Sequence, residues 1–67
     1  MNNTDLIVNL EGLIKRYIDD KDVVKELIKN IEPSKVKYVL GEIDKYRSKE
    51  YSSGDKDLLK DIYFYYC

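Results

Sequence analysis

Histidine and tryptophan are absent from this 67-residue sequence, and cysteine and proline each occur once. Without histidine, the chain lacks the most frequent general base, the imidazole of nucleophile triads and the usual nitrogen ligand of zinc. One cysteine, Cys67, cannot form an internal disulfide, a thiolate zinc site or a CxxC redox motif. Cys67 could join two chains, but we interpret it as a terminal thiol without a role.

Phosphate-binding loops are also missing, because the three glycines, Gly12, Gly41 and Gly54, stand far apart. A phosphate-cradling loop or a dinucleotide fingerprint needs glycines grouped within a few residues. Any catalysis would have to rest on carboxylates, lysines and tyrosines. A domain this short also has little room for a substrate cavity of the usual few hundred cubic ångströms. We therefore expect no enzyme, no cofactor and no small-molecule substrate.

The closest group of carboxylates is Asp19, Asp20 and Asp22. A calcium-binding EF-hand loop that begins at Asp20 would need glycine and glutamate at the positions of Lys25 and Ile31. The spacing therefore fails for calcium. We interpret these aspartates as a solvated turn that caps the helix after it, and we expect no metal site.

Neither sign of charge dominates, because 12 basic and 13 acidic residues are mixed along the chain and give a net charge of −1. Such a balance supplies no general attraction for nucleic acid or for a membrane surface. The apolar runs are far shorter than the roughly 20 residues needed to span a bilayer, and the polar start does not resemble a signal peptide. We expect a cytoplasmic protein.

Apolar residues recur at the period of an α-helix, and a chain of 67 residues is enough for one domain. The sequence predicts an all-α, single-domain bundle of four short amphipathic helices. The predicted helices span residues 5–18, 22–31, 34–49 and 56–66. Their inward faces comprise Leu6, Ile7, Leu10, Leu13, Ile14, Tyr17 and Ile18; Val23, Val24, Leu27, Ile28 and Ile31; Val36, Val39, Leu40, Ile43 and Tyr46; and Leu58, Leu59, Ile62, Tyr63, Tyr65 and Tyr66.

The ends of these helices follow from capping residues and from the single proline. Thr4 and Asp5 predict the start of the first helix, with residues 1–3 frayed. Pro33 predicts a break followed by the first turn of the third helix. The loop 51–55 contains serine, glycine and aspartate, which suit a turn and a cap for the last helix.

Four of the eight aromatic residues are consecutive, from Tyr63 to Tyr66. A short strand over residues 62–66 is the alternative to a helix, but the chain offers no second strand to pair with it. In a helix, Phe64 lies about 160° from the centre of the apolar face, near Cys67. An exposed phenylalanine forgoes roughly 1.5–3 kcal/mol of burial free energy. Either the last helix is central and buries both sides, or a second copy or another protein covers Phe64.

A second unexplained position is the outer face of the third helix, where Tyr38 and Gly41 lie close together. Glycine inside a helix is up to about 1 kcal/mol less favourable than alanine. Gly41 is therefore either an accident or a place where another molecule approaches closely. Gly12 in the first helix raises the same question.

These observations favour a non-enzymatic protein-interaction module, of an inhibitor, adaptor or self-associating kind, that acts through its aromatic last helix. Its shortness and its composition would suit a phage or viral accessory protein. The expected partner is another protein or a second copy. The predicted partner-binding residues are Phe64, Tyr63, Tyr65, Tyr66, Tyr38 and Gly41.

The alternative is a DNA-binding regulator with a helix-turn-helix centred on residues 30–34. Its candidate contacts are Lys35, Lys37, Lys45, Arg47 and Lys49. Against it, Leu27 or Ile28 stands where the motif usually has a small residue, and Glu32 and Pro33 stand where the turn glycine is common. The net acidity also supplies no electrostatic attraction to DNA.

Overall fold

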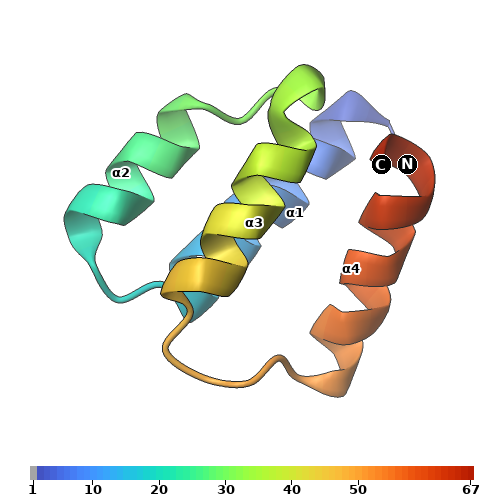
Figure 1. Cartoon of the computed structure of the whole chain (residues 1–67). Helices are drawn as coiled ribbons and strands as arrows, with labels where there is room; N and C mark the ends of the chain where they lie inside the picture. Colours follow the sequence, from blue (N-terminus) through green and yellow to red (C-terminus); the bar gives the residue numbers. More distant parts are fainter. Residues whose placement is uncertain (1) are drawn as a thin grey trace.

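Four α-helices and one 3₁₀ turn account for most of residues 2–67, the part of the chain that this computed structural model describes (Figure 1). These residues contain no strand, so the all-α prediction is confirmed and the alternative strand over 62–66 is wrong. The elements are α1 (Asn3–Tyr17), α2 (Lys21–Lys29), η1 (Pro33–Lys35), α3 (Val36–Tyr46) and α4 (Ser53–Tyr66).

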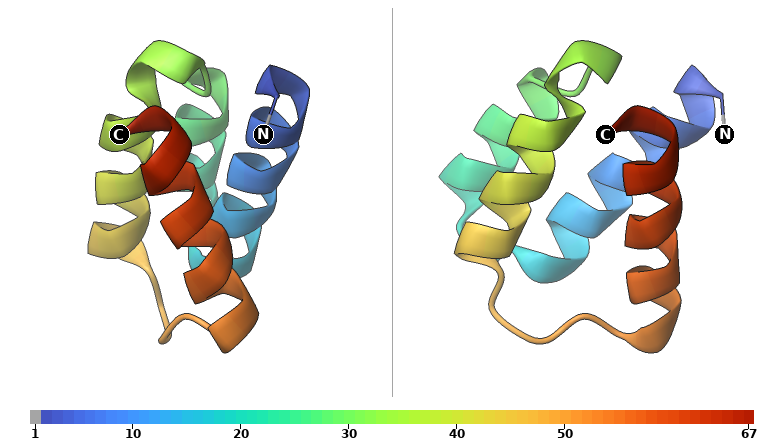
Figure 2. Two further views of the ribbon diagram at one scale, coloured as in Figure 1. Left: turned by 90° about the vertical axis from the view of Figure 1, so that its right-hand side faces the viewer. Right: turned by 45° about the vertical axis from the view of Figure 1, so that its right-hand side comes forward.

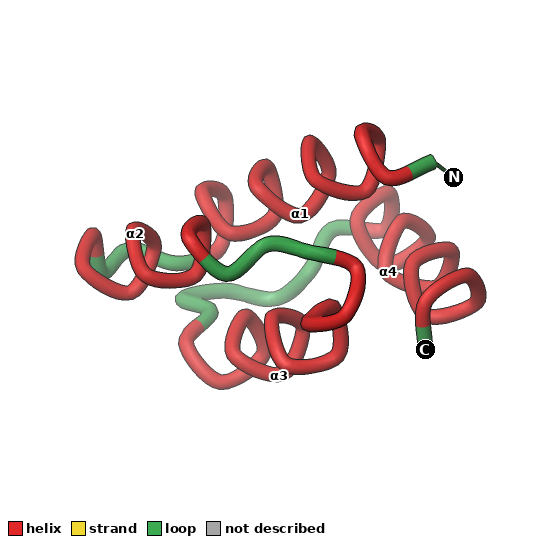
Figure 3. Tube along the Cα trace, turned by 90° about the horizontal axis from the view of Figure 1, so that it is seen from above, coloured by secondary structure: helices red, strands yellow, loops and turns green. Residues whose placement is uncertain are grey.

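The helices α1 and α3 lie in the middle of the bundle, with α2 on one side and α4 on the other (Figures 1 and 3). The helix α1 contacts both α2 and α3, and α3 contacts α4. The first turn of α1 and the last turn of α4 lie at the same end of the bundle (Figure 2). The helix α4 is therefore a flanking element, which leaves one of its sides facing away from the other helices.

Side chains that precede three of the helices accept hydrogen bonds from their free backbone amides. Asn2 Oδ1 accepts from Asp5 N at 2.8 Å, so α1 begins at Asn3, two residues before the predicted start. Asn2 and Asn3 thus belong to an ordered helix start, which corrects the prediction that they are frayed; Met1 lies outside the described residues. The predicted aspartate cap of α2 is confirmed, since Asp20 accepts from the amides of the first turn.

The two helices that flank the last loop differ more from their predicted bounds. The helix α3 ends at Tyr46 instead of residue 49, because Arg47 turns to ψ 140° and Ser48 N donates to Tyr17 O at 2.8 Å. The helix α4 begins at Ser53 instead of residue 56, because Ser52 Oγ accepts from Asp55 N at 3.2 Å. A contact with α1 and a serine cap thus move the loop toward α3.

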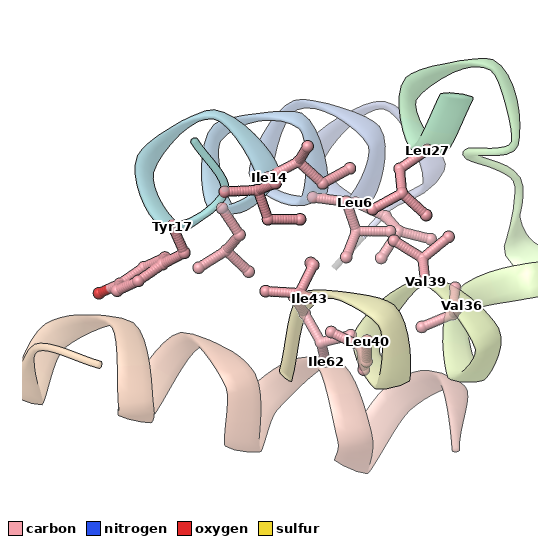
Figure 4. Packing of buried hydrophobic residues seen from close by; sticks show 12 residues of the cluster. Leu6, Ile14, Tyr17, Leu27, Val36, Val39, Leu40, Ile43 and Ile62 are labelled. Atoms are coloured by element: carbon pink, nitrogen blue, oxygen red, sulfur yellow. The ribbon is translucent and has the colours of Figure 1, made fainter. Parts of the chain in front are cut away.

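Twelve buried hydrophobic side chains among residues 2–67 form one core, and Figure 4 shows it between α1, α3 and α4. The helices α1, α2 and α3 supply ten of them, and Ile18 directly follows α1. The helix α4 supplies Ile62 alone. Leu58, Leu59 and Tyr66 are partly buried against this core. The attachment of α4 therefore depends on one fully buried residue and a ring of half-buried ones.

Four residues that the helical period assigned to the core are exposed, and these assignments are wrong. Tyr63 and Tyr65 are 49% and 57% exposed, because they flank Ile62 on a helix with neighbours on one side only. Tyr46 is 41% exposed and lies at the edge of α3 that faces α2. Ile7 is 38% exposed. The predicted apolar faces were thus too broad for so small a bundle.

Candidate functional site

The outer side of α4 carries the most exposed large hydrophobic residue of the described chain, Phe64, at 81% exposure. Phe64 lies two residues after Ile62, which is fully buried, and two residues correspond to about 200° around a helix. Figure 2 shows α4 in front of the remaining helices, so this side points away from them. The interpretation in which α4 is central and buries Phe64 within the chain is therefore wrong.

Phe64 has aromatic neighbours on the same helix. The Phe64 and Tyr65 rings meet edge to face, with 5.1 Å between their centroids and 89° between their planes. Tyr63, on the other flank of Phe64, is half exposed. We call Tyr63, Phe64 and Tyr65 the α4 aromatic surface. Exposed Cys67 follows it at the end of the helix.

Tyr66, which was also predicted to bind a partner, is not part of the α4 aromatic surface. Its ring is partly buried against the core, and its hydroxyl donates to Asn3 Oδ1 at 3.5 Å. This contact joins the last turn of α4 to the first turn of α1. Tyr66 thus helps to hold α4 in place.

The other two predicted partner-binding residues, Tyr38 and Gly41, lie on α3 and do not adjoin the α4 aromatic surface. Tyr38 is 52% exposed and borders two grooves, one of which is also lined by α2. Figure 3 shows α2 and α4 on opposite sides of the bundle. Gly41 is exposed, and a Cβ added to it would have no atom within 4 Å. The six predicted residues are therefore divided between two sides of the molecule.

The basic residues of the DNA-binding alternative lie on several elements. Lys35 belongs to η1, Lys37 and Lys45 to α3, and Arg47 and Lys49 to the loop after it. Arg47 pairs with Asp44 and Glu50 at 3.3 and 3.4 Å, and the hydrogen bond to Asp44 raises the pKa of Arg47.

Two of these lysines lie over tyrosine rings. The Lys45 Nζ is 5.2 Å from the centre of the Tyr46 ring, and the Lys49 Nζ is 5.5 Å from that of Tyr17. Arg47, Lys45 and Lys49 thus already have partners within the chain. Of the five candidate DNA contacts, only Lys37 and Lys45 lie on α3, the helix that would have to enter the groove of DNA.

A polar cluster between α1 and α4 was not predicted from the sequence. The Tyr17 hydroxyl donates to Asp55 Oδ2 at 2.5 Å, and the Arg16 guanidinium donates to both carboxylate oxygens at 2.8 and 3.3 Å. The hydrogen bond from Tyr17, followed by that from Arg16, lowers the pKa of Asp55. The partners are 38 and 39 residues apart, so no local pattern could have indicated them.

The ring of Tyr51 completes this junction. It meets the Tyr17 ring edge to face, with the centroids 4.8 Å apart. Burial raises the pKa of the Tyr51 hydroxyl, and the negative charge of Asp44 raises it further. The hydrogen bonds of Tyr17 to Asp55 and from Ser52 N hold the loop before α4 against the end of α1.

The remaining surface of the described chain has no enclosed ligand site among the grooves between its helices that adjoin α2. A groove of about 670 Å³ lies between the end of α1 and α2 and is open to solvent; its lining includes Ile18, Val24 and Ile28 with lysines and aspartates around them. Within residues 2–67, no three cysteine, aspartate or glutamate side chains lie close enough together to hold a metal ion. No helix of this part of the chain is both long and apolar enough to cross a membrane.

Comparison with known protein families, with curated proteins and with solved structures gives no match for this chain. The fold defines the molecule as a small all-α bundle. Its function has to be inferred from its own surface.

Proposed function

We propose that this protein is a non-enzymatic protein-interaction module that binds another protein, or a second copy of itself, through the α4 aromatic surface. The observation that carries the proposal is the 81% exposure of Phe64 beside half-exposed Tyr63 and Tyr65. Burying one such phenylalanine side chain contributes roughly 1.5–3 kcal/mol. A partner that covers this surface gains that free energy.

The composition of the surface suits an interface better than a folding core. Tyrosine and phenylalanine supply large apolar areas with few rotatable bonds, and the tyrosine hydroxyls tolerate a half-wet environment. Aromatic residues of this kind are frequent among those that dominate binding free energy. The tyrosines thus suit the rim of a contact centred on Phe64.

We expect folding not to depend on the outer side of α4. The helix is attached through Ile62, through the half-buried ring around it and through the Asp55 cluster, all on its other side. Replacing Phe64 should therefore change binding while leaving the fold intact. A cytoplasmic inhibitor, an adaptor or a self-associating accessory protein of phage or viral origin would each use the surface in this way.

Self-association is tested by size-exclusion chromatography with light scattering over a range of protein concentrations. We expect wild type to exceed the 8.0 kDa of one chain at high concentration and Phe64→Ala to remain at that mass. Val8→Ala is the matched control, because Val8 is also apolar, is 63% exposed and lies on α1. Identical masses for all three proteins would contradict binding to a second copy.

Binding to a different protein needs a test in the native cell. A photo-cross-linking phenylalanine analogue at position 64 should capture one specific protein, which is then purified and titrated with wild type and Phe64→Ala. The same analogue at position 8 serves as the control. The proposal fails if position 64 captures no more than position 8 and the chain is also monomeric, or if Phe64→Ala binds the captured protein as tightly as wild type.

A further inference from the structure

A second surface lies on the side of the bundle opposite α4, in a groove of about 190 Å³ between α2 and α3. We call it the α2–α3 groove. It is lined by Val23, Glu26, Leu27, Tyr38, Glu42 and Tyr46. Its volume is below the roughly 300 Å³ at which small-molecule pockets begin, so it suits a single long side chain.

The floor and walls of the groove are apolar and aromatic. Leu27 is 2% exposed, and Val23 beside it is partly buried against the core. Tyr38 and Tyr46 are eight residues apart on α3, which places them on neighbouring parts of the helix surface, and they are 52% and 41% exposed. The exposure of Tyr46, which the helical period assigned to the core, is thus explained by its position at this groove.

Two carboxylates complete the lining, Glu26 from α2 and Glu42 from α3. The four ion pairs found within residues 2–67 involve neither of them, and no lysine or arginine lines the groove. Two lysines on the neighbouring elements have other contacts: Lys45 Nζ lies 5.2 Å from the centre of the Tyr46 ring, and Lys35 Nζ donates to Asn30 Oδ1 at 3.2 Å. The groove therefore combines negative charge with aromatic faces.

We propose that the α2–α3 groove binds a lysine or arginine side chain from a basic segment of a partner protein. The aliphatic stem of such a side chain packs on apolar surface while its charged end stays near solvent, as the Leu27 floor and the open rim allow. The exposed Tyr38 ring attracts the cation, and the two carboxylates pair with it. The same carboxylates repel phosphate groups, which argues against nucleic acid on this side.

This inference goes beyond the α4 aromatic surface, because it names a different site and a different partner chemistry. The groove lies between α2 and α3 and the other surface lies on α4, and Figure 3 shows α2 and α4 on opposite sides of the bundle, so one chain can hold two proteins at once. Each surface can also fail its test independently of the other.

The test is an NMR titration of the ¹⁵N-labelled full chain with N-acetyl-arginine amide and N-acetyl-lysine amide, and with N-acetyl-norleucine amide as an uncharged probe of similar length. We expect saturable shifts at Glu26, Leu27, Glu42 and Tyr46 with the two cationic probes. The affinity should fall at higher salt, and the norleucine probe should bind at least five-fold more weakly.

Two double variants distinguish binding in the groove from a general attraction of the cationic probes to the acidic protein. Glu26→Gln with Glu42→Gln should weaken arginine-amide binding at least five-fold, whereas Asp57→Asn with Asp61→Asn makes the same change in net charge on α4 and should leave it unchanged. Equal binding of the charged and uncharged probes, shifts that map elsewhere, or equal losses in both double variants would overturn the proposal. Circular dichroism confirms that the variants remain helical.

Discussion

The Tyr17 hydroxyl lies 2.5 Å from Asp55 Oδ2 and donates a hydrogen bond that joins the last residue of α1 to the first turn of α4. The same hydroxyl accepts from Ser52 N at 3.0 Å. One phenol thus holds both the carboxylate and the backbone at the start of α4. The orientation of the α4 aromatic surface depends on this junction as well as on Ile62.

Removal of that hydroxyl should destabilise the protein. Tyr17→Phe keeps the buried ring but leaves Asp55 and Ser52 N without this partner, which typically costs about 1–2 kcal/mol. A 67-residue domain has about 3–10 kcal/mol of stability in total, so the loss is easily measured by urea unfolding. Tyr38→Phe is the matched control, since Tyr38 is half exposed, and it should change stability by less than about 0.5 kcal/mol. Equal urea midpoints for Tyr17→Phe and Tyr38→Phe would show that the hydrogen bonds of the Tyr17 hydroxyl do not contribute to stability.

Acid should weaken the same junction. The hydrogen bonds from Tyr17 and Arg16 lower the pKa of Asp55 in the folded state, so folding favours the charged carboxylate. This contribution is complete above the unfolded pKa of about 3.9 and is lost as the pH falls through the lower folded value.

The check is the free energy of unfolding of wild type and Asp55→Asn between pH 2 and pH 6. Asparagine does not titrate in this range. The stability advantage of wild type should therefore be constant above about pH 5 and should shrink steadily below about pH 4. Parallel curves over the whole range would exclude Asp55 as a source of the acid sensitivity.

The amphipathic period and the capping residues were sufficient to predict the number and order of the helices, because both signals are local. The aspartate cap before α2 is an example, since Asp20 contacts amides only two and three residues later. The end of α3 was predicted too late because Ser48 bonds to Tyr17 O, a partner 31 residues away. Periodicity also cannot state how many neighbours a helix has, which is why Tyr63 and Tyr65 were assigned to the core.

Surface sites on a single helix could be predicted from the sequence, but surface sites shared between helices could not. Phe64 was identified from its angle on a single helix, and the structure leaves it exposed. The groove beside Tyr38 was not predicted, because its lining comes from two helices whose relative placement the sequence does not state. Residues that act alone can be identified from periodicity, whereas sites shared between helices need the tertiary structure.

The two internal helix glycines should respond differently to alanine. At Gly41 an added Cβ meets no atom within 4 Å, and no glycine of the described chain has a positive φ. Gly41→Ala should therefore raise the stability by about 0.5–1 kcal/mol. At Gly12 the added Cβ would lie 2.8 Å from Arg16 Nη1, so the guanidinium that binds Asp55 must move.

Thermal unfolding followed by circular dichroism compares the two variants. We expect a higher melting temperature for Gly41→Ala and a smaller gain, or a loss, for Gly12→Ala. A full gain from Gly12→Ala when it is introduced into an Arg16→Ala background would confirm the steric cause. Equal gains for the two single variants would show that Arg16 moves at no cost.

Effects of very different size on stability are expected for Ile62, which faces the core, and Phe64, which faces away from it on α4. Ile62→Ala removes the one fully buried side chain of this helix and should cost about 2–5 kcal/mol. Phe64→Ala, although it removes a larger side chain, should change the stability of the monomer by less than about 0.5 kcal/mol, because Phe64 is 81% exposed.

Hydrogen exchange at low protein concentration measures these stabilities residue by residue. In Ile62→Ala, the amides of α4 should lose protection before those of α1 and α3, because α4 is the flanking helix. A large loss of stability for monomeric Phe64→Ala would show that its ring supports the fold, and the α4 aromatic surface would then no longer be available to a partner.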